Sequence, residues 1–325
     1  MSAHSTAIEV RRLAKHYGKT VAVDDLSFDV HPGQVTGFLG PNGAGKSTTL
    51  RMILGLDEPT SGSALVYGQP FASHRRPLFE IGALLDPKSF HPGRSARNHL
   101  SVLALANGID QTRVDVVLDL VGLTSVASKR AGGFSLGMGQ RLGIASALLG
   151  DPSILILDEP INGLDPDGIL WVRNLLRSLA AEGRTVLVSS HLMSEMALTA
   201  DHLVVIGQGR LLADDTVDAF VAANGPNTVH VRSPQSEQLA VLLAAHGASA
   251  TAPAPGVLDI TGASTDLVGD VAAAHGITIH ELSLQQVTLE EAFMELTHDS
   301  VEYRTETLTI DPPTTRSLVT QESAA

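Results

Sequence analysis

A glycine-rich run at residues 40–48 has the residue types and the spacing of a phosphate-binding loop. Glycines let successive backbone amides approach phosphate oxygens, because no Cβ atom stands in the way. Lys46 would place a positive charge near the β- and γ-phosphates, and the Ser47 hydroxyl could ligate Mg²⁺. The run therefore predicts a site for Mg²⁺ and for the phosphates of a nucleotide. Its residues fit the pattern of glycine, four residues, glycine, lysine and serine or threonine: Gly40, Pro41, Asn42, Gly43, Ala44, Gly45, Lys46, Ser47 and Thr48.

Two adjacent carboxylates follow an aliphatic run at residues 154–157, which predicts a strand buried on both faces. Asp158 would hold Mg²⁺, directly or through water. Glu159 would accept a proton from the attacking water, and Pro160 ends the strand. Taken alone, the pair of carboxylates is equally consistent with an ordinary solvated turn. Together with the glycine-rich loop, it favours hydrolysis of the bound nucleotide.

The segment at residues 134–141 distinguishes this chain from other nucleotide-binding proteins that carry the same two motifs. It reads Phe-Ser-Leu-Gly-Met-Gly-Gln-Arg and opens a predicted helix upstream of the two carboxylates. Here the chain resembles the ATP-binding-cassette family, whose signature reads Leu-Ser-Gly-Gly-Gln in its common form. Ser135 and Gly137 match that form, whereas Leu136 and Met138 depart from it. A simple helix N-cap is the alternative for Ser135.

The resemblance implies ATP as the ligand and a second cassette as a partner. A hydroxyl, free amides and a helix N-terminus make a second anion site, which lies too far from the first loop to share one ATP within a chain. In the family, two cassettes pair head to tail, and each signature caps the other's nucleotide. A homodimer, or a paired cassette, is therefore expected, with Ser135 and Gly137 on the partner's ATP.

Three more residues match functional positions of the family. Tyr17 matches the aromatic residue that stacks on adenine; packing against the edge of a sheet is its alternative. Asp165, in the loop at residues 162–165, matches the acidic member of the loop that signals across the dimer. A helix cap is its alternative, and both roles can hold. His191 follows a predicted strand and matches the histidine that contacts the γ-phosphate, although a lone histidine is more often structural.

Asp86 stands where the family usually has a glutamine at the end of a strand. Its side chain is shorter and negatively charged, so its reach to Mg²⁺ or to the attacking water is left open. We keep it as a third candidate metal ligand beside Ser47 and Asp158. The resemblance implies that the region following Asp86 grips the coupling helix of a membrane subunit.

The alternation of short apolar runs with amphipathic stretches predicts an α/β fold of the phosphate-loop cassette type for residues 1–225. We expect a mainly parallel sheet, an antiparallel edge sheet and a helical subdomain at about residues 90–150. A breaker cluster follows, and residues 226–299 predict a small α+β domain whose order of elements fits a ferredoxin-like arrangement. This domain should end in a helix at residues 289–296. Residues 300–325 are polar and should be disordered.

The bulk composition limits the location and the partners of the chain. Its 22 Lys and Arg against 35 Asp and Glu give a formal net charge of −13, which argues against nucleic acid. It has no cysteine, no predicted secretory signal and no apolar run of the roughly 18 residues that a membrane span needs. We expect the cytoplasmic face of the cell membrane, reached through a separate permease that the resemblance implies.

The C-terminal helix pattern at residues 287–297 resembles the daunorubicin- and bacitracin-type drug-export ATPases. That subgroup implies ATP-driven export of a drug-like, peptide or lipid cargo. A DNA-repair or chromosome-organising ATPase would carry long heptad insertions, and a translation-factor ATPase would carry two cassettes. A regulatory module that does not hydrolyse ATP is a further alternative, against which Glu159 and His191 both count.

Overall fold

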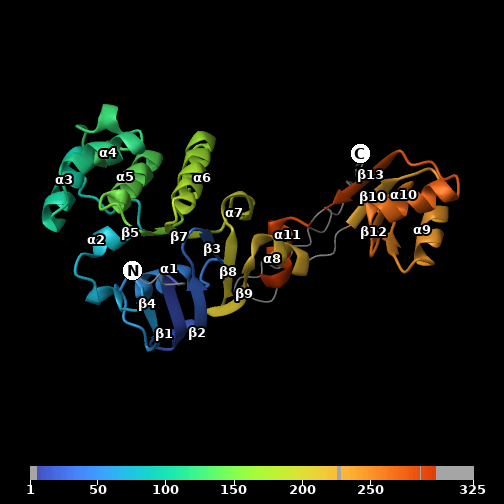
Figure 1. Ribbon diagram of the computed structural model, residues 1–325, viewed down its shortest axis with the longest axis horizontal. Coiled ribbons are helices and arrows are strands. Elements are labelled where there is room, and N and C mark those ends of the chain that lie inside the picture. The colour runs from blue at the N-terminus through green and yellow to red at the C-terminus, as the bar shows by residue number, and fades with distance from the viewer. Residues whose placement is uncertain (1–5, 225–227, 286, 298–325) are drawn as a thin grey trace, which may run out of the picture.

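The structure, a computed structural model, describes residues 6–224, 228–285 and 287–297 (Figure 1). Residues 6–224, called the N-terminal part below, hold two sheets. The expected tail at residues 300–325 lies outside the described residues. The strands and helices of the N-terminal part are β1 (Ile8–Tyr17), β2 (Thr20–Val30), β3 (Val35–Leu39), α1 (Lys46–Ile53), β4 (Ser61–Val66), α2 (Pro77–Glu80), β5 (Ile81–Leu84), α3 (Ala96–Asn107), α4 (Thr112–Leu120), α5 (Leu136–Leu148), β6 (Ile154–Asp158), α6 (Pro166–Ala181), β7 (Thr185–Ser190), α7 (Met193–Thr199), β8 (His202–Gly207), β9 (Arg210–Thr216) and α8 (Val217–Ala223).

The central sheet has six strands in the order β5-β6-β7-β3-β8-β9. All neighbouring strands are parallel except β9, which runs antiparallel to β8. Every residue of β3, β6 and β7 is buried, as continuous aliphatic runs covered on both faces require. Since parallel strands end at one edge of a sheet, β3, β6 and β7 bring the glycine-rich loop, the two carboxylates and His191 to the same edge.

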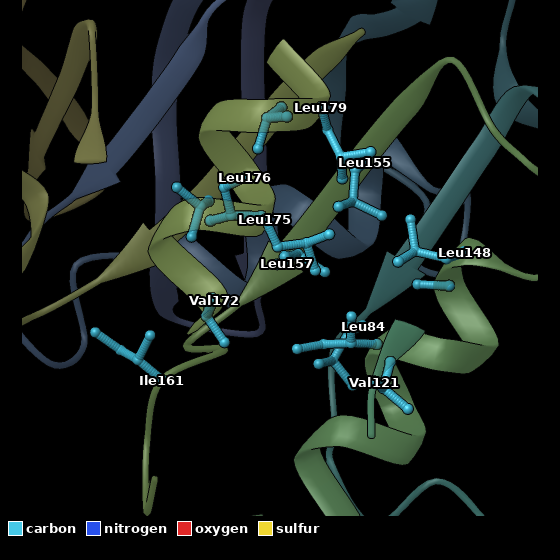
Figure 2. Packing of buried hydrophobic residues seen from close by; sticks show 14 of the residues in the cluster. Leu84, Val121, Leu148, Leu155, Leu157, Ile161, Val172, Leu175, Leu176 and Leu179 are labelled. Carbon is cyan, nitrogen blue, oxygen red and sulfur yellow. The ribbon is translucent and has the colours of Figure 1, made fainter. Parts of the chain in front are cut away.

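One face of the central sheet is covered by the antiparallel sheet β2-β1-β4 together with α1. Phe28 of β2 stacks on Phe38 of β3, with ring centroids 5.4 Å apart. The other face is covered by helices. In Figure 2, Leu155 and Leu157 of β6 meet Leu176 and its neighbours on α6, while Leu84 of β5 lies near the helices of residues 96–148. The sheet is therefore held between two apolar layers. This packing fixes the position of the edge at which the parallel strands end.

Residues 228–285, called the small α+β unit below, form a four-stranded antiparallel sheet in the order β11-β12-β10-β13. Two helices cover one face of it, which gives the ferredoxin-like β-α-β-β-α-β order that the sequence fitted. The last strand was expected at residues 277–282 and lies instead at Glu281–Gln285. Ile277 is buried because it packs into the core from the turn after α10, and not as part of a strand. The elements are β10 (Thr228–Arg232), α9 (Ser236–Ala244), β11 (Ser249–Thr251), β12 (Val257–Thr261), α10 (Thr265–Ala274) and β13 (Glu281–Gln285).

The final helix, α11 (Leu289–Thr297), does not close the small α+β unit as we expected. It packs against α7 and α8 of the N-terminal part, as Figure 1 shows. Leu289, Ala292 and Phe293 join the same core as Phe220 of α8. An amphipathic pattern identifies a helix with one buried face, but it does not identify the surface that buries it.

The α/β architecture, with a mainly parallel sheet, an antiparallel sheet, a helical region and a small α+β unit, is confirmed. Among the described residues, none of the helices has both the length and the apolar character that spanning a bilayer requires.

Candidate functional site

The glycine-rich loop connects β3 to α1 and needs its glycines for two physical reasons. Gly43 and Gly45 have φ angles of 84° and 100°, a region that side chains with a Cβ rarely occupy. A Cβ atom on Gly40 would lie 2.6 Å from the Ile206 carbonyl oxygen, and one on Gly45 would overlap the carbonyl oxygen of Ala22. The loop thereby presents backbone amides at the N-terminus of α1, a geometry that fits phosphate.

Lys46, the first residue of α1, turns its ammonium group back onto the loop. Nζ donates to the carbonyl oxygens of Gly40 at 2.6 Å and of Pro41 at 3.3 Å. The residue is only 7% exposed. Burial lowers the pKa of Lys46, and the negative charges of Glu159 and Asp158 oppose that shift. The loop thus holds a largely desolvated cation beside the place where phosphates would bind.

Asp158, the last residue of β6, accepts two hydrogen bonds from hydroxyl groups. Ser47 Oγ donates to Asp158 Oδ2 at 2.6 Å, and Ser189 Oγ donates to Asp158 Oδ1 at 2.5 Å. Ser47 lies in α1 and Asp158 ends β6, so the structure brings together two of the predicted metal ligands from separate segments. Hydroxyl and carboxylate oxygens are the ligands that Mg²⁺ prefers, and this donor set fits that ion.

Glu159 has a left-handed backbone with φ of 50°, which is unusual for a residue other than glycine. Four hydrogen bonds hold this conformation, one of them donated by the Asn162 amide to the Glu159 carbonyl oxygen at 3.2 Å. The Glu159 amide donates to Ser189 Oγ at 3.0 Å and to the Ser189 carbonyl oxygen at 3.2 Å, while Gln140 Nε2 donates to the Glu159 carbonyl oxygen at 2.8 Å. The carboxylate lies 2.8 Å from His191 Nδ1. Such local strain is typical of functional sites.

Ser135 and Asp165 both cap helices, which is the alternative role that the sequence offered for each of them. Ser135 Oγ accepts from the Met138 amide at 3.2 Å at the start of α5, and Asp165 Oδ1 accepts from the Gly168 amide at 2.9 Å at the start of α6. Gly137 lies against the loop before α6, since a Cβ atom there would be 3.3 Å from Leu164 Cδ2.

The phosphate loop and the signature line different hollows of the chain. Pro41, Asn42, Gly43 and Ala44 line a hollow of about 500 Å³. Ser135 lines another of about 530 Å³, together with apolar residues from the loop after β5. Within one chain, the structure therefore does not bring Ser135 to the phosphate loop.

Tyr17 ends β1 with its side chain 49% exposed. Its hydroxyl donates to Asp57 Oδ2 at 3.1 Å, and Arg51 of α1 donates to both oxygens of the same carboxylate. Burial and the hydrogen bond to Asp57 raise the pKa of Tyr17, whereas Thr48 lowers it. Lys15 Nζ lies 5.0 Å from the centroid of the Tyr17 ring. The ring is thus tied to the helix that begins at Lys46.

Asp86 is held by its own loop. Its Oδ1 accepts from the Lys88 amide at 2.8 Å, while Ser47 and Asp158 bond to each other. Further along this loop, Phe90 meets the ring of His99 edge-on, with centroids 6.2 Å apart. The shorter side chain thus contacts the loop that follows it, and its role as a metal ligand stays a prediction.

Two residues of the site were not predicted. Ser189 contacts both Asp158 and Glu159, and the signal for it was a pair of serines directly before His191 at the end of a strand. Gln140 is fully buried in α5, where an amide among apolar residues marks a position with a specific hydrogen-bond partner.

Comparisons with known proteins agree with this geometry. A family model described as ABC transporter matches residues 23–162, and a domain of unknown function matches residues 227–290. The bacitracin transport ATP-binding protein BcrA of Bacillus licheniformis is 44% identical over 223 residues, which cover 68% of this chain and 73% of BcrA. The uncharacterized ABC transporter ATP-binding protein YhcH of Bacillus subtilis (strain 168) is 37% identical over 302 residues, covering 91% of this chain and 98% of YhcH.

Solved structures show the same fold. A structure of the ATP-binding subunit of an ABC transporter has a TM-score of 0.62 at 29% identity and covers 67% of this chain and 93% of its own. A dimeric post-hydrolysis state of the cassette MJ0796, bound to ADP and Pi, has a TM-score of 0.59 at 22% identity, covering 64% and 98%. The chain belongs to the family of ABC transporter ATP-binding subunits, and it is an ATPase.

Proposed function

We propose that the carboxyl edge of the central sheet binds Mg-ATP and activates water against its γ-phosphate. Ser47 and Asp158 would hold Mg²⁺, which when bound neutralises phosphate charge, and Lys46 would exchange its loop carbonyls for phosphate oxygens. Glu159 accepts the proton of the attacking water, and His191 orients the Glu159 carboxylate. The observation that carries this assignment is the 2.8 Å contact between Glu159 Oε2 and His191 Nδ1, directly beside the Asp158–Ser47 hydrogen bond.

We further propose that the site is completed by a second cassette arranged head to tail. Ser135 and Gly137 stand at the N-terminus of α5, a geometry suited to phosphate, yet Ser135 lines a different hollow from the phosphate loop of the same chain. A second copy would bring its α5 to the first copy's nucleotide. Tyr17 would stack on the adenine, and Asp165 would lie at the dimer interface.

The proposed biological role is to power export through a separate membrane permease at the cytoplasmic face of the membrane. BcrA, whose name assigns it to bacitracin transport, supports a drug-like or peptide cargo. The loop after β5, which carries Phe90, offers an apolar surface to a helical segment of that permease. Co-purification of the full chain with a protein that spans the membrane several times would support this role, and failure to recover any such protein with the chain would contradict it.

The experiment that tests the hydrolytic site replaces Glu159→Gln, which keeps the size and removes the base. Positioned general bases contribute roughly 10²–10⁴-fold, so we expect the turnover number for ATP to fall by that factor while equilibrium ATP binding persists. Glu182→Gln is the matched control, because Glu182 pairs with Arg184 at the end of α6. Unchanged turnover in Glu159→Gln would refute the assignment.

A further inference from the structure

The first turns of α5 are joined to the segment after β6 at three places. Gln140 Nε2 donates to the Glu159 carbonyl oxygen at 2.8 Å. The Leu136 side chain lies against Gly163, and Gly137 lies against Leu164. The helix that carries the signature is thus in direct contact with the backbone that carries the proposed general base of the same chain.

The Gln140 contact acts on a strained peptide. The Gln140 side chain is fully buried, and its Oε1 has no hydrogen-bond partner among the residues that the structure describes. Burying an acceptor without a hydrogen-bond partner costs free energy. The hydrogen bond that the Gln140 NH₂ group donates therefore accounts for an amide at this position. That bond ends on Glu159, whose left-handed φ of 50° makes the direction of its side chain depend on how its peptide groups are held.

The Leu136 contact is a fit between two unusual residues. Leu136 stands where the signature's common form has a glycine, and its side chain fills the space that a Cβ atom on residue 163 would need. Such an atom would overlap Leu136 Cδ2 and lie 2.7 Å from Leu136 Cγ, but it would lie 3.5 Å, an ordinary contact, from Leu136 Cβ. Gly163 also has a φ of 75°. Leu136 is 46% exposed, so its side chain would have to rotate away to admit a Cβ atom at residue 163.

We propose that Leu136 and Gln140 are positioning residues that couple the N-terminus of α5 to the Glu159 carboxylate of their own chain. This inference rests on the proposed function, in which α5 meets the nucleotide of the partner subunit and Glu159 serves its own. A displacement of α5 by that nucleotide pulls on the Glu159 peptide through Gln140 and on the loop at Gly163 through Leu136. Occupancy of one ATP site thereby determines how the Glu159 carboxylate of the other site is oriented.

The first test replaces Gln140→Glu in the full chain, which keeps the shape and replaces the donor by a carboxylate oxygen. We expect the turnover number to fall about 10- to 100-fold, while the KM for ATP and the equilibrium binding of ATP change less than about twofold. A residue with only a structural role would lower the melting temperature and the folded fraction without separating kcat from KM. Unchanged turnover per folded molecule would overturn the role of Gln140.

The second test is a double-mutant cycle on Leu136→Ala and Gly163→Ala. Gly163→Ala alone should lower turnover about tenfold, because the new Cβ displaces the leucine side chain. In the Leu136→Ala background the same change should lower turnover less than about threefold, since only the backbone strain at φ of 75° remains. Equal factors in the two backgrounds would overturn the coupling at this contact.

A third comparison separates failure of this inference from failure of the proposed function. In a Glu159→Gln background, Gln140→Glu should not change the residual turnover, because the base that it positions is gone. Full activity of Glu159→Gln itself would remove the proposed function and the coupling together. A different result would overturn only the coupling. If Glu159→Gln strongly lowered turnover and adding Gln140→Glu lowered it further by an independent factor, the assignment of Glu159 as the base would stand.

Discussion

His191 Nδ1 lies 2.8 Å from Glu159 Oε2 and so joins the end of β7 to the end of β6. The β-strands place both residues at one edge of the sheet, and the contact orients the carboxylate. We predict that His191→Ala lowers ATP turnover by about 10- to 100-fold, because a hydrogen bond to a charged group contributes about 1.5–3 kcal/mol. The measurement is steady-state phosphate release. His202→Ala is the control, since His202 pairs with Asp214 on strands β8 and β9, and equal losses in both variants would contradict the prediction.

Ser189→Ala should impair the site as strongly as a change in a charged residue. One hydroxyl group donates to Asp158 and accepts from the Glu159 amide, so its loss releases a metal ligand and a strained peptide together. We expect turnover to fall about tenfold or more and the Mg²⁺ concentration for half-maximal activity to rise. Titration of Mg²⁺ at saturating ATP checks this. Ser190→Ala, which removes only a hydrogen bond to the Leu192 amide, should leave the Mg²⁺ dependence unchanged.

Tyr17→Phe should weaken ATP binding slightly even though the aromatic ring remains. The hydroxyl anchors the ring to Asp57, which Arg51 binds on α1, so its loss lets the ring rotate. We expect the KM for ATP to rise about two- to fivefold with an unchanged kcat, because a solvent-exposed contact to a charged group contributes at most about 1 kcal/mol. Asp57→Asn should act in the same direction, and Tyr17→Ala should act more strongly because stacking is lost as well. A KM in Tyr17→Phe as high as in Tyr17→Ala would assign the effect to the hydroxyl alone.

Acid should destabilise the chain in part through His99. Burial, with a smaller contribution from Arg94, lowers the pKa of His99 from its ordinary value of 6.5. Between that value and the lower folded-state pKa, the unfolded chain binds a proton that the folded chain does not, so the free energy of unfolding decreases as the pH falls. One such proton corresponds to a slope of about 1.4 kcal/mol per pH unit.

Urea unfolding of His99→Gln from pH 7.5 to pH 5 measures this contribution. The variant should lose stability less steeply below pH 6.5 than the parent chain does. An identical slope for the His99→Gln variant and the parent would show that other groups set the acid limit.

Phe293→Ala should destabilise the cassette, although the residue lies near the end of the described chain. Phe293 is 6% exposed and belongs to the core around α7 and α8, so the change should lower the free energy of unfolding by about 3–5 kcal/mol. Met294 is the matched control because it is its neighbour and is 63% exposed. Met294→Ala should change stability by no more than about 0.5 kcal/mol.

The sequence predicted those parts of the fold and site that depend on local pattern. Strands β3, β6 and β7 are continuous aliphatic runs followed by polar residues, so their ends and the residues at those ends could be read directly. The strand near residue 280 was misplaced, because the burial of Ile277 in a turn is indistinguishable from burial in a strand. The surface that buries α11 could not be predicted, since helical periodicity carries no information about a partner.

The same limit applied to side-chain contacts. The hydrogen bond from the Lys88 amide to Asp86 depends on the path of the loop after β5. The bond from Gln140 to Glu159 and the fit of Leu136 against Gly163 depend on how separate segments meet. Departures from the usual family pattern marked Asp86 and Leu136 in the sequence. The contacts that each of these side chains makes are visible only in the folded chain.

The position of α11 also has a consequence for how the chain is made. Residues 228–285 are synthesised between α8 and α11, so apolar residues of α7 and α8 that α11 covers stay exposed in the growing chain until the last described helix has followed. Exposed apolar surface of this kind promotes aggregation of incomplete chains. A reading frame that stops anywhere within the small α+β unit would therefore yield a cassette whose apolar surface on α7 and α8 is not covered. Every residue of its nucleotide site would nevertheless have been translated.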